Sequence, residues 1–185
     1  MIAKSRILIF GAGVIGSAYA IKFTEAGFDV TLFARSNRLI VLKEKGIQYN
    51  EKGEAKSIKV NAINTLENDD VYDFIFVTVR YEQSEAALLT LKDNKSKNIV
   101  TMMNNSAGLS LWQSILGDKL LPAFPGVGGQ IKDGVLYARF PPKANPLALN
   151  TLRTSPKYTF LPSISVCNFS IFSLPFLVTS INIFK

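Results

Sequence analysis

Three glycines near the start of the chain have the spacing of a loop that holds phosphate groups, since Gly11, Gly13 and Gly16 form a GxGxxG pattern. A short apolar run precedes them, and a stretch rich in small residues follows. In such a loop the first glycine permits a tight turn, the second lets the backbone approach a pyrophosphate, and the third lets the helix pack closely on the sheet. The helix N-terminus then attracts the anion through its unpaired N–H groups and its dipole. The predicted cradle comprises Gly11, Ala12, Gly13, Val14, Ile15 and Gly16.

A glycine turn that serves only the close packing of a helix on a strand would show the same three residues. The pattern, however, follows a plausible buried strand, opens a plausible helix and is soon followed by a second strand candidate at residues 29–33. That context favours a dinucleotide ligand.

The residues about 20 positions beyond the first glycine indicate which dinucleotide such a loop prefers, because they reach the adenosine ribose. An NAD site places Asp or Glu there, whereas this chain carries Arg35, Ser36 and Arg38. Guanidinium groups offer a 2'-phosphate a permanent charge and paired hydrogen bonds. Asp29 lies at the opposite end of the expected strand and does not compete for the ribose. The pattern predicts NADP(H) rather than NAD(H), and the alternative is that both arginines are solvated charges at a helix start.

The composition is that of a basic globular protein. Of 185 residues 48% are hydrophobic and 19% are charged, and 21 basic against 14 acidic side chains give a net charge of +7. This charge suits an anionic ligand, and because the basic residues are scattered we expect no nucleic-acid partner. Histidine is absent and Cys167 is the only cysteine, so we expect no metal site, no internal disulfide and a reducing, cytoplasmic setting. The N-terminus leads directly into the first expected strand, which predicts no signal peptide.

The elements that would position these residues alternate between strand and helix, and the chain is long enough for one domain with a sizeable core. Such alternation predicts an α/β fold with a Rossmann-type, doubly wound and mainly parallel sheet. Residues 47–60 indicate a polar hairpin around Gly53, and residues 119–140 indicate short strands divided by a loop at 125–129. The expected strands are 6–10, 30–34, 74–79 and 98–103, and the expected helices are 14–26, 37–45, 82–91 and 110–116.

The chain changes character near residue 142. Prolines punctuate it from Pro141 onward, and residues 158–184 hold no charged side chain. We expect a dinucleotide-binding domain over residues 1–142 and an irregular apolar tail over residues 143–185. Prolines and several Ser and Asn residues in the tail oppose a membrane span, so we expect no membrane partner. A packed extension of the domain and a membrane-tethered protein stay open as alternatives to this poorly specified tail.

Polar side chains follow two further expected strands. Arg80 and Gln83 come after the third strand, and Asn104 comes after the fourth. Open α/β sheets bind their ligands at these carboxyl ends. Together with the glycine loop and Arg35, these positions make residues 5–140 resemble the ketopantoate reductase (2-dehydropantoate 2-reductase) family, whose members use NADPH to reduce a branched 2-oxo acid.

The resemblance implies a role for each residue. The glycine loop would hold the pyrophosphate and Arg35 the 2'-phosphate, while Arg80 stands where the family has a lysine and Gln83 matches the glutamine that follows. Asn104 would lie beside the nicotinamide and the substrate, which makes it the catalytic candidate. Asn105 replaces a glycine of the family and indicates a different loop. The alternatives are that Asn104 caps the next helix and that Arg80 is a surface charge.

The family's helical second domain, with its general-acid lysine, is missing from the expected elements. The resemblance therefore implies an NADPH-binding domain for hydride transfer to a small 2-oxo acid, incomplete as a single chain. A truncation or a shifted reading frame after about residue 142 would explain the tail, and an uncovered apolar face would favour a homodimer. The alternative is a non-catalytic sensor or interaction module that binds NADP(H) only as a ligand.

Overall fold

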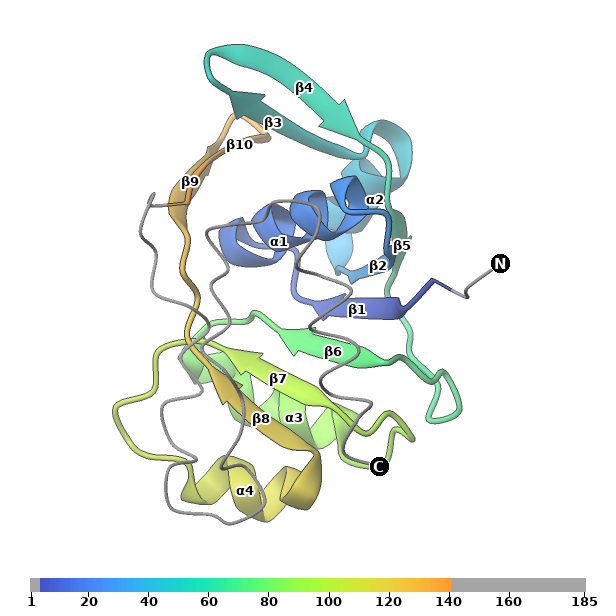
Figure 1. Ribbon diagram of the computed structural model, residues 1–185, viewed down its shortest axis with the longest axis vertical. Coiled ribbons are helices and arrows are strands. Elements are labelled where there is room, and N and C mark those ends of the chain that lie inside the picture. Colours follow the sequence, from blue (N-terminus) through green and yellow to red (C-terminus); the bar gives the residue numbers. More distant parts are fainter. Residues whose placement is uncertain (1–3, 141–185) are drawn as a thin grey trace.

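The computed structural model describes residues 4–140 of the 185-residue chain. In this part of the chain, helix α1 (Val14–Glu25) lies between a large sheet and a smaller one (Figure 1). The expected domain boundary at residue 142 and the expected tail lie outside the described residues. Within residues 4–140, no helix combines the length and the apolar content that crossing a bilayer requires.

The large sheet has six strands, and every pair of neighbours in it is parallel. Its order is β5-β2-β1-β6-β7-β8, so the chain builds outward from β1 in one direction and then from β6 in the other. Open sheets of this kind bind ligands where the direction reverses, which here is at the carboxyl ends of β1 and β6. The strands are β1 (Arg6–Phe10), β2 (Asp29–Phe33), β5 (Asn61–Ile63), β6 (Phe74–Val77), β7 (Ile99–Met102) and β8 (Leu120–Ala123).

The two faces of this sheet carry separate cores, because successive side chains of a strand point to opposite faces. Ile7 and Ile9 belong to the core that contains α1, whereas Leu8 and Phe10 belong to the core beneath the helices that follow β6 and β7. The predicted doubly wound, mainly parallel fold is confirmed. The remaining helices are α2 (Ser36–Lys45), η1 (Tyr81–Gln83), α3 (Ser84–Leu91), α4 (Ser110–Leu116) and η2 (Gly117–Lys119).

The smaller sheet covers the side of α1 that faces away from the large sheet (Figure 1). This double cover explains why six consecutive residues of α1, from Gly16 to Ile21, are buried instead of a single stripe. Leu136 is 1% exposed and joins the core around α1, while the hydroxyl of Tyr19 accepts a hydrogen bond from the N–H of Gly126 at 3.2 Å. The sheet has the order β4-β3-β10-β9, with strands β3 (Ile47–Glu51), β4 (Glu54–Ile58), β9 (Gly128–Lys132) and β10 (Val135–Arg139).

The structure differs from the predicted elements in three places. Strand β5 was not predicted, because three residues are too few to show a hydrophobic period. The predicted hairpin at 47–60 and the predicted short strands after residue 119 are present, but β3 pairs in parallel with β10, so the two hairpins form one sheet. The helix predicted to start at residue 82 starts at Ser84, after a turn of 3-10 helix.

Charged side chains also connect the end of α1 to the β3–β4 hairpin. The ammonium group of Lys22 lies 2.7 Å from Glu25 and 3.6 Å from Glu51, and that of Lys56 lies 2.7 Å from Glu51. The hydrogen bond from Lys56 holds the pKa of the Glu51 carboxyl below its usual range. Because these groups reach solvent, their pairs contribute little to stability, and the apolar contacts with α1 determine how the smaller sheet packs.

Replacing Leu136 with Ala tests this packing. We expect Leu136→Ala to lower the free energy of unfolding by about 2–4 kcal/mol, because it opens a cavity between β10 and α1. The neighbouring Tyr137→Ala is the control, since Tyr137 is 44% exposed and its loss should cost less than about 1 kcal/mol. Urea denaturation measures both, and equal effects of the two variants would contradict the packing of the smaller sheet on α1.

Candidate dinucleotide-binding site

The loop between β1 and α1 is held in place by the strands on both sides of it. Gly11 has a φ of +125°, which disfavours any residue with a side chain. Its N–H donates to the carbonyl of Phe33 at 3.2 Å, and its own carbonyl accepts from the hydroxyl of Thr78 at 2.8 Å. The loop is therefore fixed to the carboxyl ends of β2 and β6, where the sheet order reverses.

The three glycines of the loop have different surroundings. A Cβ at Gly16 would overlap the carbonyl oxygen of Gly11 and lie 2.6 Å from the hydroxyl oxygen of Thr78, so α1 can approach β1 and β6 only without one. A Cβ at Gly13 would meet nothing within 4 Å, and Gly13 has a φ of −79° that any residue can adopt. Packing and a positive φ thus account for Gly11 and Gly16, whereas Gly13 is under neither constraint and has only the mild preference for glycine at a helix N-cap.

The first turn of α1 has free hydrogen-bonding capacity. Gly13 is the N-cap residue of α1, no side chain caps the helix, and no acidic residue lies in its first turn. Val14 and Ile15 pack against the core with their side chains, as does the side chain of Ala12. The backbone N–H groups at this end can therefore donate hydrogen bonds to an anion.

The two arginines that follow β2 lie in different environments. Arg35 is exposed, precedes α2 and has no ion-pair partner among residues 4–140. Arg38 turns back onto the glycine loop, where its Nε donates to the carbonyl of Ala12 at 3.2 Å and its Nη2 to the hydroxyl of Ser17 at 3.1 Å. The interpretation of both as solvated charges is therefore wrong for Arg38. Burial lowers the pKa of the Arg38 guanidinium, which nonetheless stays charged near neutral pH.

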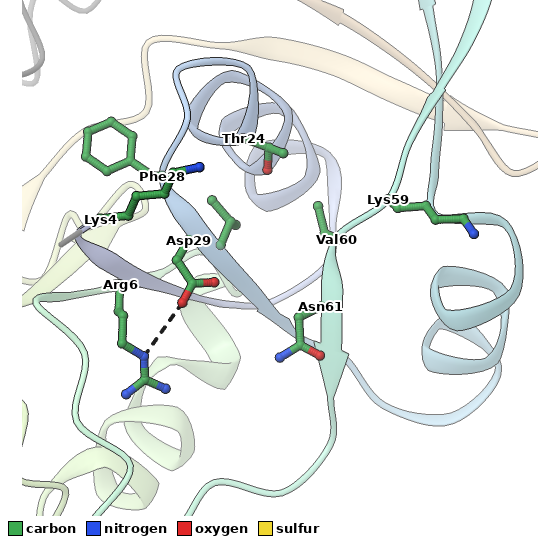
Figure 2. Close-up of a pocket in the computed structure, with 9 residues that line it drawn as sticks. Lys4, Arg6, Thr24, Phe28, Asp29, Lys59, Val60 and Asn61 are labelled. Carbon is green, nitrogen blue, oxygen red and sulfur yellow. Dashed lines mark ion pairs between the residues drawn. The ribbon is translucent and has the colours of Figure 1, made fainter. Parts of the chain in front are cut away.

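Asp29 lies at the far end of β2 from the glycine loop, as predicted. It starts the strand, and its carboxylate lies 3.8 Å from Nε of Arg6 (Figure 2). Both side chains line an open groove of about 670 Å³ at the amino ends of β1, β2 and β5. β2 therefore has no carboxylate at its carboxyl end, near Arg35.

Arg80 and Asn104 follow neighbouring strands at equivalent places. Val77 of β6 pairs with Thr101 of β7, and each polar residue stands the same distance beyond its member of that pair. Both are exposed, as is Gln83, whose N–H donates to the carbonyl of Arg80 at 2.9 Å.

The loop after β7 tests the alternative that Asn104 caps helix α4. The N-cap residue of α4 is Leu109, so Asn104 does not cap that helix. Asn105 instead shapes the loop, because its side chain donates to the carbonyl of Gly108 at 2.6 Å and accepts from the N–H of Ala107 at 2.9 Å. Such local bonds let asparagine stabilise a turn.

Thr78 is a site residue that sequence reasoning missed. It is buried, and its hydroxyl fixes the carbonyl of Gly11. Its position at the end of the apolar strand before Arg80 was the available signal, but a threonine is common in strands and is not distinctive there.

The sequence matches the model of the ketopantoate reductase PanE/ApbA family over residues 7–123. The chain belongs to this family. A comparison with curated protein sequences finds no match.

Solved structures of related fold cover 71–72% of the chain. A D-mandelate dehydrogenase in a ternary complex with NADH and anilino(oxo)acetate shares 19% sequence identity at a TM-score of 0.62. A 2-dehydropantoate 2-reductase from Methylococcus capsulatus shares 19% at 0.60, and a dimeric ketopantoate reductase from Staphylococcus aureus shares 21% at 0.52. The chain spans 44–45% of the length of these three proteins.

The different surroundings of Gly13 and Gly16 give a test of the loop geometry. We expect Gly16→Ala to lower the free energy of unfolding by about 3 kcal/mol, because its methyl group meets backbone atoms that cannot move away cheaply. Gly13→Ala should lower it by no more than about 1 kcal/mol, because no atom obstructs the methyl group and the only loss is that of a glycine at the N-cap of α1. Thermal and urea denaturation of both variants check this, and a Gly16→Ala variant as stable as Gly13→Ala would show that α1 lies farther from β6.

Proposed function

We propose that this chain binds NADPH and is the cofactor-binding part of a reductase that transfers a hydride to a small 2-oxo acid. The observation that carries the proposal is the exposed Gly13, which stands in a loop held by hydrogen bonds to Phe33 and Thr78 and has open space where a side chain would be. A residue free of packing constraints at this position is explained by a ligand that approaches the backbone closely. A pyrophosphate is such a ligand.

The electrostatics of this edge favour an anion. The helices α1 and α2 both begin here, neither is capped by a side chain, and neither has an acidic residue in its first turn. Their dipoles and unpaired N–H groups add to the charges of Arg35 and Arg80. We assign the pyrophosphate to residues 11–16.

Arg35 supports NADPH over NADH as the ligand. It is exposed at the carboxyl end of β2 without an ion-pair partner in the described part of the chain, so its guanidinium can bind a 2'-phosphate through two hydrogen bonds. An NAD site would need a carboxylate at this place, and Asp29 lies at the other end of the strand. We assign the 2'-phosphate to Arg35, and we assign contacts with the rest of the cofactor to Arg80 and Gln83.

Asn104 is the residue we assign to the reaction itself. It follows β7 beside the position of Arg80, at the edge where the nicotinamide would lie. Bound NADPH supplies the hydride, and the side-chain amide of Asn104 can orient the carbonyl of the 2-oxo acid by a hydrogen bond. The oxygen of that carbonyl also needs a proton. We propose that its donor and the other wall of the substrate site lie beyond the dinucleotide-binding domain of residues 1–142.

Parallel titrations with NADPH and NADH test the assignment of Arg35. We expect the chain to bind NADPH more tightly, and we expect Arg35→Ala to weaken NADPH binding about 10- to 100-fold while NADH binding stays the same, since charged hydrogen bonds contribute about 1.5–3 kcal/mol. Lys43→Ala is the control, because Lys43 is an exposed cation farther along the same helix. Calorimetry gives the affinities, and tighter binding of NADH by the unmodified chain would overturn the role of Arg35.

A further inference from the structure

We propose that Arg38 is a positioning residue, which holds the glycine loop in its binding conformation and strengthens the binding of NADPH and NADH equally. This inference rests on the proposed function, and it adds a residue whose effect differs in kind from that of Arg35. Arg38 orders the loop that binds the pyrophosphate, and Arg35 binds the 2'-phosphate.

Arg38, Ser17 and the carbonyl of Ala12 are all hydrogen-bonded to one another at the loop. Its guanidinium donates through Nε to the carbonyl of Ala12 and through Nη2 to the hydroxyl of Ser17. That hydroxyl in turn donates to the same carbonyl of Ala12 at 3.4 Å, and Ser17 is fully buried. Arg38 thereby links the first turn of α2 to the loop and to the first turn of α1.

These contacts determine where the backbone N–H of Gly13 points. In a trans peptide the carbonyl and the following N–H point in opposite directions, so fixing the carbonyl of Ala12 toward Arg38 turns the N–H of Gly13 away from it. Thr78 fixes the preceding carbonyl, that of Gly11, in the same manner from β6. Two consecutive peptide planes are thus held, one by Arg38 of α2 and the other by Thr78 at the end of β6. The loop therefore needs no reordering when an anion binds.

The side chain of Arg38 is also unsuited to the role of Arg35. Both of its donor groups named above are already engaged with the loop, and it is half-buried where Arg35 is exposed. Its charge still lies beside the loop and attracts the pyrophosphate, which NADPH, NADH and ADP share. A lysine could keep this charge but could not reproduce the fork that reaches both partners.

The test compares Arg38→Met and Arg38→Lys with Arg35→Ala and with the surface control Lys43→Met. We expect Arg38→Met to weaken the binding of NADPH, NADH and ADP by the same factor, about 10-fold or more, and Arg38→Lys to recover only part of that loss. Arg35→Ala should affect NADPH alone. Hydrogen exchange of the free protein gives a readout without ligand, in which Arg38→Met should speed the exchange of amides in residues 12–16 while circular dichroism stays unchanged.

The outcomes separate this inference from the proposed function. If Arg38→Met weakens only NADPH, Arg38 reads the 2'-phosphate and the inference is overturned. Unchanged affinities together with unchanged exchange of residues 12–16 would overturn it as well, with the proposed function intact. An unmodified chain that binds none of the three nucleotides would remove the proposed function, and the inference with it.

Discussion

The close approach of α1 to the ends of β1 and β6 is the constraint on which the cofactor edge of this molecule depends. At Gly16 the helix lies so near the carbonyl of Gly11 that no side chain fits between them. The hydroxyl of Thr78 occupies the same small space and bonds to that carbonyl. This contact sets the height of the loop above the sheet and brings the N-terminus of α1 to the point where the strand order reverses. Everything proposed about phosphate binding follows from that placement.

The side of α1 that faces away from the large sheet packs against the smaller sheet. The smaller sheet, contributed by two hairpins far apart in the sequence, covers α1 and buries Tyr19 and Leu136. A helix that only lay on one sheet face could shift along it, whereas a helix packed between two sheets has little freedom. The geometry of the loop is therefore supported by packing at a distance, and not only by the residues that line it.

The sequence predicted those parts of the fold that depend on local pattern. Local sequence patterns predicted β1, α1, β2 and α2 to within one or two residues, and the glycine spacing identified the loop. The parallel pairing of β3 with β10 was not foreseeable, because it joins segments that are distant in sequence and short. The inward turn of Arg38 was missed for a similar reason. Its neighbours Ser36 and Asn37 are exposed, and only the fold brings it to Ala12 and Ser17.

The central claim is that the edge formed by residues 11–16 and Arg35 binds NADPH, and amide NMR spectra of the chain with added NADPH test it most directly. The account predicts that the largest shifts fall on the amides of residues 11–16 and of Arg35 and its neighbours, with smaller shifts near Arg80 and Asn104. It also predicts no shifts in the groove at the other end of the sheet, around Lys4 and Lys59. Unchanged spectra, or shifts concentrated in that groove, would contradict the claim.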